Sequence, residues 1–321
     1  MSDTVLEIRD LTKSFASRSA MPSRTKIENI AVNKVSFAVS AAETLGIVGE
    51  SGCGKSTLAL TIMRLYEPDA GKIDFEGIDI TRLNRRELKP VRRNMQLVFQ
   101  DPLAAFDPRL RVDQIIGEPL EIHGIGTLRS NRDYAASLLR KVGLYPEDMH
   151  RLPSEFSGGQ QQRIGIARAL ALKPRLLICD EPVSALDVSV QAQILNLLRD
   201  LQDEFGFSYI FISHNIAITA FMSNRIGVMY LGKLMEMGST ESITKNPRHP
   251  YTKELLAAIP EPDPSFRDNN IYSKSEPTEF EGRPTGCVFR MRCPIAQEIC
   301  AAGEPPLRTI DNGHQTACHF A

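Results

Sequence analysis

A glycine-rich segment of the chain carries a lysine followed by two hydroxyl residues, a combination that binds phosphate groups. It follows a short apolar run, residues 45–48, and precedes a helical stretch from Lys55 to about Leu65. Glycines let backbone N–H groups wrap a phosphate, and the helix N-terminus adds the positive end of its dipole. Lys55 is predicted to reach the β- and γ-phosphates of a nucleotide, and Ser56 to hold Mg²⁺ through its hydroxyl. The predicted phosphate-binding loop consists of Gly49, Glu50, Ser51, Gly52, Cys53, Gly54, Lys55, Ser56 and Thr57.

An apolar strand that ends in two carboxylates supplies a second set of reactive groups. Residues 176–179 are Leu-Leu-Ile-Cys, and Asp180 and Glu181 follow them. The strand fixes Asp180, which can coordinate Mg²⁺ directly or through water, while Glu181 projects to where a carboxylate can polarise an attacking water. A strand ending in Asp-Glu can also be a structural cap. Because a phosphate-binding loop precedes it in the same chain, nucleotide hydrolysis is favoured.

The elements that must position these groups alternate along the chain. Strand-like and helical stretches follow one another, which is typical of a largely parallel α/β sheet. Residues 16–30 are polar and basic, and we expect a loop there. From about 112 to 170 the pattern turns helical, which indicates an inserted helical subdomain, about residues 101–172. Strands are expected at 5–9, 32–39, 45–48, 72–75, 97–99, 176–179, 209–212, 225–230 and 233–237, and helices at 55–65, 131–142, 157–170 and 188–204.

Length and composition limit the classes of protein. The 321 residues suggest about two domains, which we place at 1–250, a nucleotide-binding domain, and 251–321, a C-terminal extension. The formal net charge of −1 argues against a strongly basic nucleic-acid-binding protein. No apolar run approaches the ~20 residues that span a bilayer, and the first residues lack the pattern of a signal peptide. We therefore expect a cytosolic protein whose membrane role is peripheral.

Further motifs follow in the order found in one ATPase family. Residues 156–160, Phe-Ser-Gly-Gly-Gln, resemble the Leu-Ser-Gly-Gly-Gln signature of ABC (ATP-binding cassette) ATPases, with Phe in place of Leu. Gln100 occupies the family's Q-loop position, Asp187 belongs to its D-loop, and His214 occupies its switch-histidine position. The resemblance covers about residues 5–240. It implies the α/β fold of a P-loop NTPase, an ABC cassette with an inserted helical subdomain, and the binding of ATP with Mg²⁺.

The resemblance also implies that the ATP site is divided between two chains. A helix N-terminus such as the one that the signature opens binds anions. In the family, ATP is held between the P-loop of one subunit and the signature of another, in a head-to-tail dimer. The signature residues, which would act in trans, are Ser157, Gly158, Gly159 and Gln160.

Individual roles carry over from the family to matching positions. His214 resembles the residue that contacts the γ-phosphate and orders the water near Glu181, so both are expected to be catalytic. Gln100 is expected to join Ser56 and Asp180 around Mg²⁺ and to relay the nucleotide state to the partner.

Phe15 resembles the aromatic residue that stacks on the adenine of ATP, although the family more often has Tyr there. The polar segment 16–30 follows it at once. An ordinary core phenylalanine is the alternative, because buried aromatic residues are common.

One branch of the family matches further stretches. Residues 246–252, Asn-Pro-Arg-His-Pro-Tyr-Thr, resemble the end of the cassette in ATP-binding subunits of dipeptide and oligopeptide permeases. Residues 100–102, Gln-Asp-Pro, and 107–109, Asp-Pro-Arg, are similar to that branch, which usually has Asn at position 107. Members power the import of short peptides, and close relatives import nickel, glutathione or other small solutes.

The cysteines gather near the end of the chain. Cys287, Cys293, Cys300 and Cys318 lie within 35 residues, whereas Cys53 fills a variable position of the phosphate-binding loop and is expected to be a small filler. In a reducing compartment such a group indicates a metal site rather than disulfides. The spacing lacks the two-residue gaps of zinc knuckles and ferredoxins. Because some permeases of this branch carry a [4Fe-4S] cluster in such a tail, we expect this iron–sulfur cluster, with zinc or free thiols as alternatives.

The resulting hypothesis is an ATPase subunit of an ABC importer for dipeptides or oligopeptides at the cytoplasmic face of the bacterial inner membrane. Its expected partners are a second ATPase subunit, a paralogue, then two transmembrane permease subunits and, indirectly, an extracytoplasmic solute-binding protein, with no nucleic acid. A nickel or glutathione importer is the nearest alternative. A soluble ABC ATPase acting on nucleic acid or ribosomes is disfavoured by the near-neutral charge and the permease-like segment. A small-molecule kinase would leave the signature and His214 without a purpose.

Overall fold

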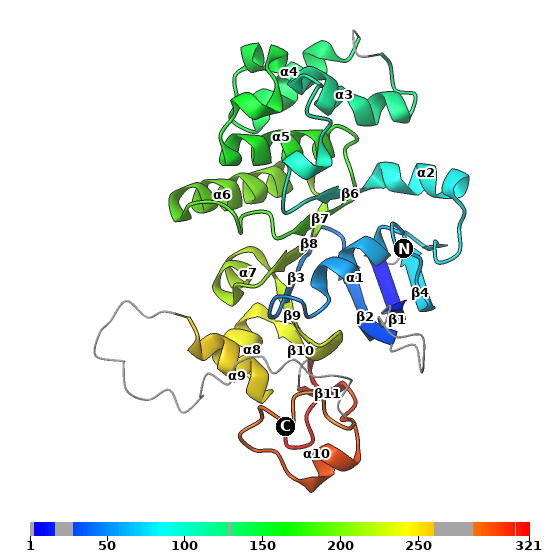
Figure 1. Ribbon diagram of the computed structural model, residues 1–321, viewed down its shortest axis with the longest axis vertical. Coiled ribbons are helices and arrows are strands. Elements are labelled where there is room, and N and C mark those ends of the chain that lie inside the picture. Colours follow the sequence, from blue (N-terminus) through cyan, green and yellow to red (C-terminus); the bar gives the residue numbers. More distant parts are fainter. Residues whose placement is uncertain (1–2, 17–27, 128–129, 260–284, 312) are drawn as a thin grey trace, which may run out of the picture.

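A twisted, mainly parallel sheet forms the centre of the molecule (Figure 1). The computed structural model describes residues 3–16, 28–127, 130–259, 285–311 and 313–321. The strand order is β11-β12-β10-β9-β3-β8-β7-β6, in which β9, β3, β8, β7 and β6 run parallel and the others antiparallel. These strands are β3 (Thr44–Val48), β6 (Met95–Val98), β7 (Leu176–Asp180), β8 (Ser208–Ser213), β9 (Arg225–Tyr230), β10 (Lys233–Ser239), β11 (Arg308–Asp311) and β12 (His314–Thr316).

A second, antiparallel sheet lies beside the first, with the order β2-β1-β4-β5. Helix α1 packs between the two sheets and shares one buried apolar cluster with both, contributing Leu58, Ala59 and Ile62. The helix that follows the glycine-rich turn is thereby held from two sides. The strands are β1 (Thr4–Ala16), β2 (Glu28–Ser40), β4 (Ala70–Phe75) and β5 (Ile78–Asp79).

Helices cover the sheet and form a lobe at one end of the molecule. Figure 1 shows α3, α4 and α5 gathered at that end, while α8, α9, α10 and the C-terminal strands lie at the other. The helices are α1 (Lys55–Ile62), α2 (Arg85–Asn94), α3 (Val112–Ile122), α4 (Arg132–Lys141), α5 (Gly158–Leu170), α6 (Val188–Phe205), α7 (Ile216–Met222), α8 (Thr240–Lys245), α9 (Pro250–Ala257) and α10 (Glu298–Ala302).

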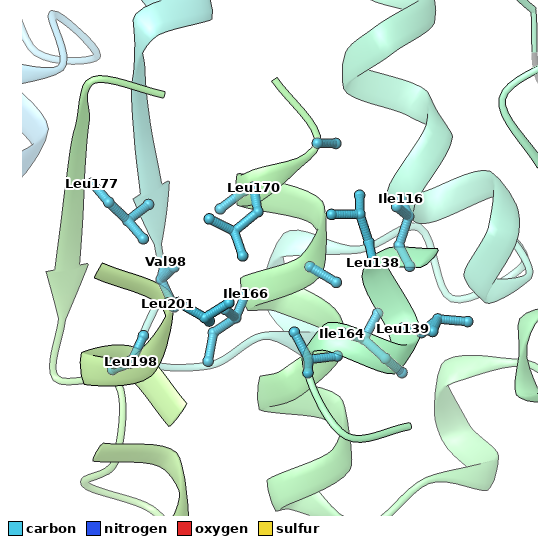
Figure 2. Close-up of a cluster of buried hydrophobic side chains, with 14 of the residues drawn as sticks. Val98, Ile116, Leu138, Leu139, Ile164, Ile166, Leu170, Leu177, Leu198 and Leu201 are labelled. Atoms are coloured by element: carbon cyan, nitrogen blue, oxygen red, sulfur yellow. The ribbon is translucent and has the colours of Figure 1, made fainter. Parts of the chain in front are cut away.

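Both faces of the central strands are buried, as is expected of parallel strands covered by helices. Along β7, Leu176 and Ile178 enter the cluster around α1, whereas Leu177 and Cys179 enter the cluster of the helical lobe. Figure 2 shows Leu177 and Val98 of the sheet beside side chains of the lobe helices. The lobe is thus continuous with the sheet through one apolar core, which fixes the position of its helix ends relative to the strands.

The described structure contains helices that were not expected, among them α7, α8 and α9, and it departs from the expectation at the first strand pair and at the C-terminal extension. Residues 16–30 were expected to form a loop, but β1 extends to Ala16 and β2 begins at Glu28, where the two strands still pair; residues 17–27 lie outside the described residues. The sequence analysis assigned no strand to the C-terminal extension, but its strand β12 pairs with β10 and so adds to the central sheet. Residues 260–284 lie outside the described residues. The predicted domain bounds, 1–250 and 251–321, stay a prediction.

A buried carboxylate ties the C-terminal segments to the sheet. Glu236 of β10 is fully buried, and its carboxylate accepts hydrogen bonds from the backbone N–H groups of Arg248 (2.6 Å) and His249 (3.0 Å). The Nε2 of His314, on β12, lies 2.6 Å from the same carboxylate. Burial lowers the pKa of His249 to about 4, so its neutral Nδ1 accepts a hydrogen bond from the Tyr251 N–H. One side chain thus joins β10, the start of α9 and β12.

Within the part of the chain that the structure describes, no helix combines the length and apolar character needed to cross a membrane.

Truncating a core residue of the lobe should destabilise the protein strongly. Ile116 on α3 is fully buried, whereas Ile122 on the same helix is 55% exposed. Ile116→Ala removes buried methyl groups and leaves a cavity, so we expect the free energy of unfolding to fall by about 2–5 kcal/mol. The matched control Ile122→Ala should change it by less than ~0.5 kcal/mol. Urea unfolding curves measure both, and equal losses would contradict the described packing.

Candidate functional site

The glycine-rich turn between β3 and α1 forms a loop whose lysine folds back onto it. The Lys55 ammonium is buried and donates hydrogen bonds to the carbonyls of Gly49 (2.7 Å) and Glu50 (2.9 Å). Gly54 caps α1 with φ 106°, and a Cβ there would lie 2.0 Å from the Ala31 carbonyl oxygen, so glycine is required. The loop therefore has the close backbone turn and the positive charge that a phosphate site needs.

Two oxygen ligands suited to Mg²⁺ lie next to this loop. The Ser56 hydroxyl donates to the Asp180 carboxylate over 3.0 Å. Asp180 is only 9% exposed, and this burial raises the pKa of its carboxyl above the usual value, although the Ser56 hydrogen bond lowers it. A buried carboxylate beside a hydroxyl, at the mouth of a phosphate loop, fits a hard divalent cation. Gln100, the third expected Mg²⁺ ligand, lines one cavity together with Ser56.

Glu181 stands at the junction of the loop and the neighbouring strand end. One carboxylate oxygen lies 3.0 Å from Nδ1 of His214, and the other lies 3.8 Å from the Lys55 ammonium. Its backbone has φ 47°, a conformation that costs a non-glycine residue about 1–2 kcal/mol. The Ile212 carbonyl accepts the Glu181 N–H, which helps to hold this backbone. The carboxylate is thus fixed between two cationic or proton-bearing groups.

A cavity of about 340 Å³ brings most of the expected nucleotide site together. Phe15 lies at it with 38% of its surface exposed and an edge-to-face contact of 5.2 Å with Tyr66. The alternative of a buried core phenylalanine is therefore wrong, whereas adenine stacking stays a prediction. The cavity is lined by Phe15, Asn29, Ala31, Ser51, Gly52, Gly54, Lys55, Ser56, Thr57, Gln100 and Glu181.

The signature and the D-loop lie outside this cavity. Ser157 caps α5 by accepting from the Gln160 N–H, and the Gln160 side chain accepts from the Ser157 N–H in return. A Cβ on Gly159 would lie 2.5 Å from Val190 on α6, so the signature packs directly on the helix that Asp187 opens. Ser157 and Asp187 are exposed. The Ser157 hydroxyl and the Asp187 carboxylate can therefore contact another molecule, whereas neither residue lines the cavity of its own chain.

Sequence reasoning missed several residues of the site. Asn29 and Ala31 line the cavity because the β1–β2 pairing, in which Asn29 faces Phe15, reaches further than expected. Tyr251 and Arg292 contact Glu50 in the phosphate-binding loop. Asn29 and Ala31 could have been found by extending the strand alternation toward the N-terminus. No local sequence signal marks Tyr251 and Arg292 as contacts of the loop.

The C-terminal cysteines form a neighbourhood without a recognisable metal centre. The pKa of the Cys287 and Cys293 thiols is raised, first by burial and further by the charges of the other tail cysteines, so the four lie in one region. Thiols are suitable ligands for iron or zinc. Yet the described residues hold no group of three or more His, Cys, Asp or Glu side chains arranged to bind a metal ion. The arrangement does not fit the expected iron–sulfur cluster or the zinc alternative, and neither receives support.

Comparisons with known proteins agree with this geometry. Residues 32–184 match the family described as "ABC transporter", and residues 235–300 match "Oligopeptide/dipeptide transporter, C-terminal region". The chain is 48% identical to the oligopeptide transport ATP-binding protein AppF of Bacillus subtilis, covering 99% of this chain and 98% of AppF. It is 49% identical to the probable peptide ABC transporter ATP-binding protein y4tS of Sinorhizobium fredii, over 99% of this chain and 90% of that protein.

A solved structure shares the fold. The dimeric, post-hydrolysis state of the ATP-binding cassette MJ0796, bound to ADP and Pi, aligns with a TM-score of 0.65 and 28% identity, covering 73% of this chain and 98% of that one. The sheet, the lobe and the loop–carboxylate–histidine arrangement thus define an ATP-hydrolysing cassette, which confirms the predicted fold class and makes the protein an ATPase. Within that class, the chain belongs to the oligopeptide/dipeptide transporter family of ABC ATP-binding proteins.

Neutralising the buried carboxylate should stabilise the protein in the absence of ligands. Because burial raises the pKa of Asp180, its charge costs stability above that pKa, and the cost disappears as the pH falls through it. Asp180→Asn should raise the free energy of unfolding at pH 7 by about 0.5–2 kcal/mol and by less at acidic pH. Urea unfolding without nucleotide or Mg²⁺ measures this. Asp200→Asn, at an exposed position of α6, is the control, and a destabilised Asp180 variant would contradict the argument.

Proposed function

We propose that the protein is the ATP-hydrolysing subunit of an importer that drives the uptake of dipeptides or oligopeptides, and that it works at the cytoplasmic face of the bacterial inner membrane. The observation that carries the proposal is the full-length similarity to the oligopeptide transport protein AppF, together with the match of residues 235–300 to the C-terminal region of such transporters. The buried contacts of Glu236 support it, because they build this region into the ATPase sheet rather than leaving it as an appendage.

In the proposed reaction, water attacks the γ-phosphate of ATP and yields ADP and phosphate. Glu181 would polarise the water, since its carboxylate is held 3.0 Å from His214 and 3.8 Å from Lys55. His214 would orient that carboxylate and contact the γ-phosphate, while Lys55 would turn from its loop carbonyls to the phosphates. Mg²⁺, when bound, would neutralise phosphate charge, and its holders would be Ser56, Asp180 and Gln100.

The site would be completed by a second ATPase subunit. The exposed Ser157 and Gly158 of the signature and the exposed Asp187 support this, because none of them lines the cavity of its own chain. A head-to-tail pair would place the helix N-terminus at Ser157 against the phosphates bound by the partner. We propose a paralogue as that partner, with two transmembrane permease subunits moved by dimer closure and an extracytoplasmic solute-binding protein acting through them.

The proposal includes neither an iron–sulfur cluster nor zinc, because the described cysteines are not arranged to hold one. It also omits nucleic acid, in keeping with the net charge of −1.

Removing the carboxylate charge at Glu181 should abolish turnover but keep ATP binding. Because a positioned general base contributes about 10²–10⁴-fold to rate, Glu181→Gln should lower kcat by that factor. ATP-bound dimers should accumulate, since closure no longer leads to hydrolysis. Phosphate release and size-exclusion chromatography with ATP measure the two effects. Glu241→Gln, which removes a carboxylate from an exposed ion pair with Lys245, is the control. Unimpaired turnover in Glu181→Gln would refute the assignment.

The transport proposal itself is tested by reconstitution. The membrane subunits that co-purify with the chain are placed in proteoliposomes with ATP on the side of the ATPase. We expect dipeptides or oligopeptides, supplied with the cognate solute-binding protein on the opposite side, to stimulate ATP hydrolysis and to accumulate on the side of the ATPase. Stimulation by nickel or glutathione alone, or co-purification with nucleic acid or ribosomes in place of membrane subunits, would contradict peptide import.

A further inference from the structure

We infer that Arg292, in the C-terminal extension, is a positioning residue for ATP binding that holds the phosphate-binding loop in place through Glu50. The inference rests on the proposed binding of ATP at this loop. It assigns to the extension a direct part in nucleotide affinity, beyond any part in transport specificity.

Arg292 reaches the loop with a two-pronged ion pair. Its Nη1 and Nη2 donate to the two carboxylate oxygens of Glu50 over 2.9 and 2.8 Å, and Nη2 also donates to Glu254 on α9. The side chain is only 6% exposed. Its guanidinium carbon lies 5.7 Å from the ring centres of both Tyr230 and Phe289. A planar guanidinium held by two carboxylates and two rings has one orientation, so the pair fixes Glu50 rigidly.

Glu50 connects this contact to the lysine of the loop. Its carbonyl accepts a hydrogen bond from the Lys55 ammonium over 2.9 Å, and its N–H donates to the Tyr251 hydroxyl over 3.0 Å. Its carboxylate is held by Arg292. The three polar groups of this one residue are thus engaged, one with Lys55 and two with the C-terminal segments. A displacement of Tyr251 or Arg292 would therefore move the carbonyl to which Lys55 is anchored.

Charge gives the contact a second effect. Glu50 and Glu254 place two carboxylates beside a loop that must accept a polyanion, and Arg292 balances them. The hydrogen bond with Glu50, above all, raises the pKa of the guanidinium beyond its already high value, so its charge is permanent. Without Arg292, the unpaired Glu50 carboxylate would repel the phosphates and compete with them for Lys55.

Arg292 contacts the phosphate-binding loop through Glu50 but does not line the cavity in which the nucleotide would bind. The described residues that line the nucleotide cavity include Ser51, Gly52 and Lys55 but not Arg292. We therefore expect its removal to weaken ATP binding while leaving the chemical step almost unchanged. A purely structural role would instead lower stability and kcat together.

The test compares Arg292→Met with Arg290→Met in the full chain. Arg290 belongs to the same segment and contacts Thr285 rather than the loop. Arg292→Met should weaken the binding of ATP with Mg²⁺, measured by calorimetry, about tenfold, equivalent to ~1.4 kcal/mol. The KM for ATP of the assembled transporter should rise in parallel and kcat should stay within about twofold. Arg290→Met should bind ATP like the unmodified chain.

Two further variants distinguish the effect of the two-pronged geometry of Arg292 from the effect of its charge. Arg292→Lys keeps the charge but loses the two-pronged contact, so ATP affinity should fall about threefold. The double variant Glu50→Gln, Arg292→Met should bind ATP more tightly than Arg292→Met, because no unpaired carboxylate remains. Thermal unfolding shows whether each variant is folded.

The inference is overturned if folded Arg292→Met and Arg292→Lys bind ATP like the unmodified chain, if Arg290→Met is equally impaired, or if the double variant is no better than Arg292→Met. Failure of the unmodified chain to bind ATP would overturn the proposed function together with the inference.

Discussion

Parallel pairing of three buried strands sets the geometry on which hydrolysis depends. Val48, the last residue of β3, pairs with Ser213 at the end of β8, and Asp180 of β7 pairs with Ile212 of β8. Because parallel strands deliver their carboxyl ends to one edge of a sheet, the residues that follow them meet there. A slip of one residue in either pairing would turn each side chain to the opposite face and separate the Glu181 carboxylate from His214. The apolar clusters on both faces of β7 make such a slip costly.

The same edge holds only part of what hydrolysis requires in this family. Much of the phosphate-binding loop and Glu181 line the cavity, and Asp180 and His214 contact lining residues, whereas Ser157 is exposed at the start of α5. Since α5 shares its core with β7 through the helical lobe, a partner that contacts the signature also contacts an element joined to the catalytic strand. The signature and the strand that ends in Asp180 are thus linked by packing and not by a flexible connection.

The sequence was sufficient where a function depends on a few consecutive residues. The loop around Lys55, the strand that ends in Asp180 and the Ser157 cap each carry their own pattern, and most of the central strands follow from apolar runs. The start of β2 at Glu28 was missed because residues 28–30 adjoin a polar and basic stretch, although the strand alternation of 32–39 could have been extended to them. The Arg292–Glu50 pair joins positions 242 residues apart, and neither periodicity nor propensity marks such a contact.

The buried Glu236 constrains how C-terminal regions can be exchanged between paralogous subunits. A recombination breakpoint between α8 and α9 would leave Glu236 on one parent and its donors, Arg248, His249 and His314, partly or wholly on the other. The Arg248 and His249 donors are backbone N–H groups, which any residue but proline supplies, so only a partner that lacks His314 would leave the buried carboxylate short of a hydrogen bond, at a cost of about 1–3 kcal/mol. Chimeras that keep β10, α9 and β12 from one parent avoid this cost. The crossover point should therefore lie before Lys233, the first residue of β10, and not at the start of the extension.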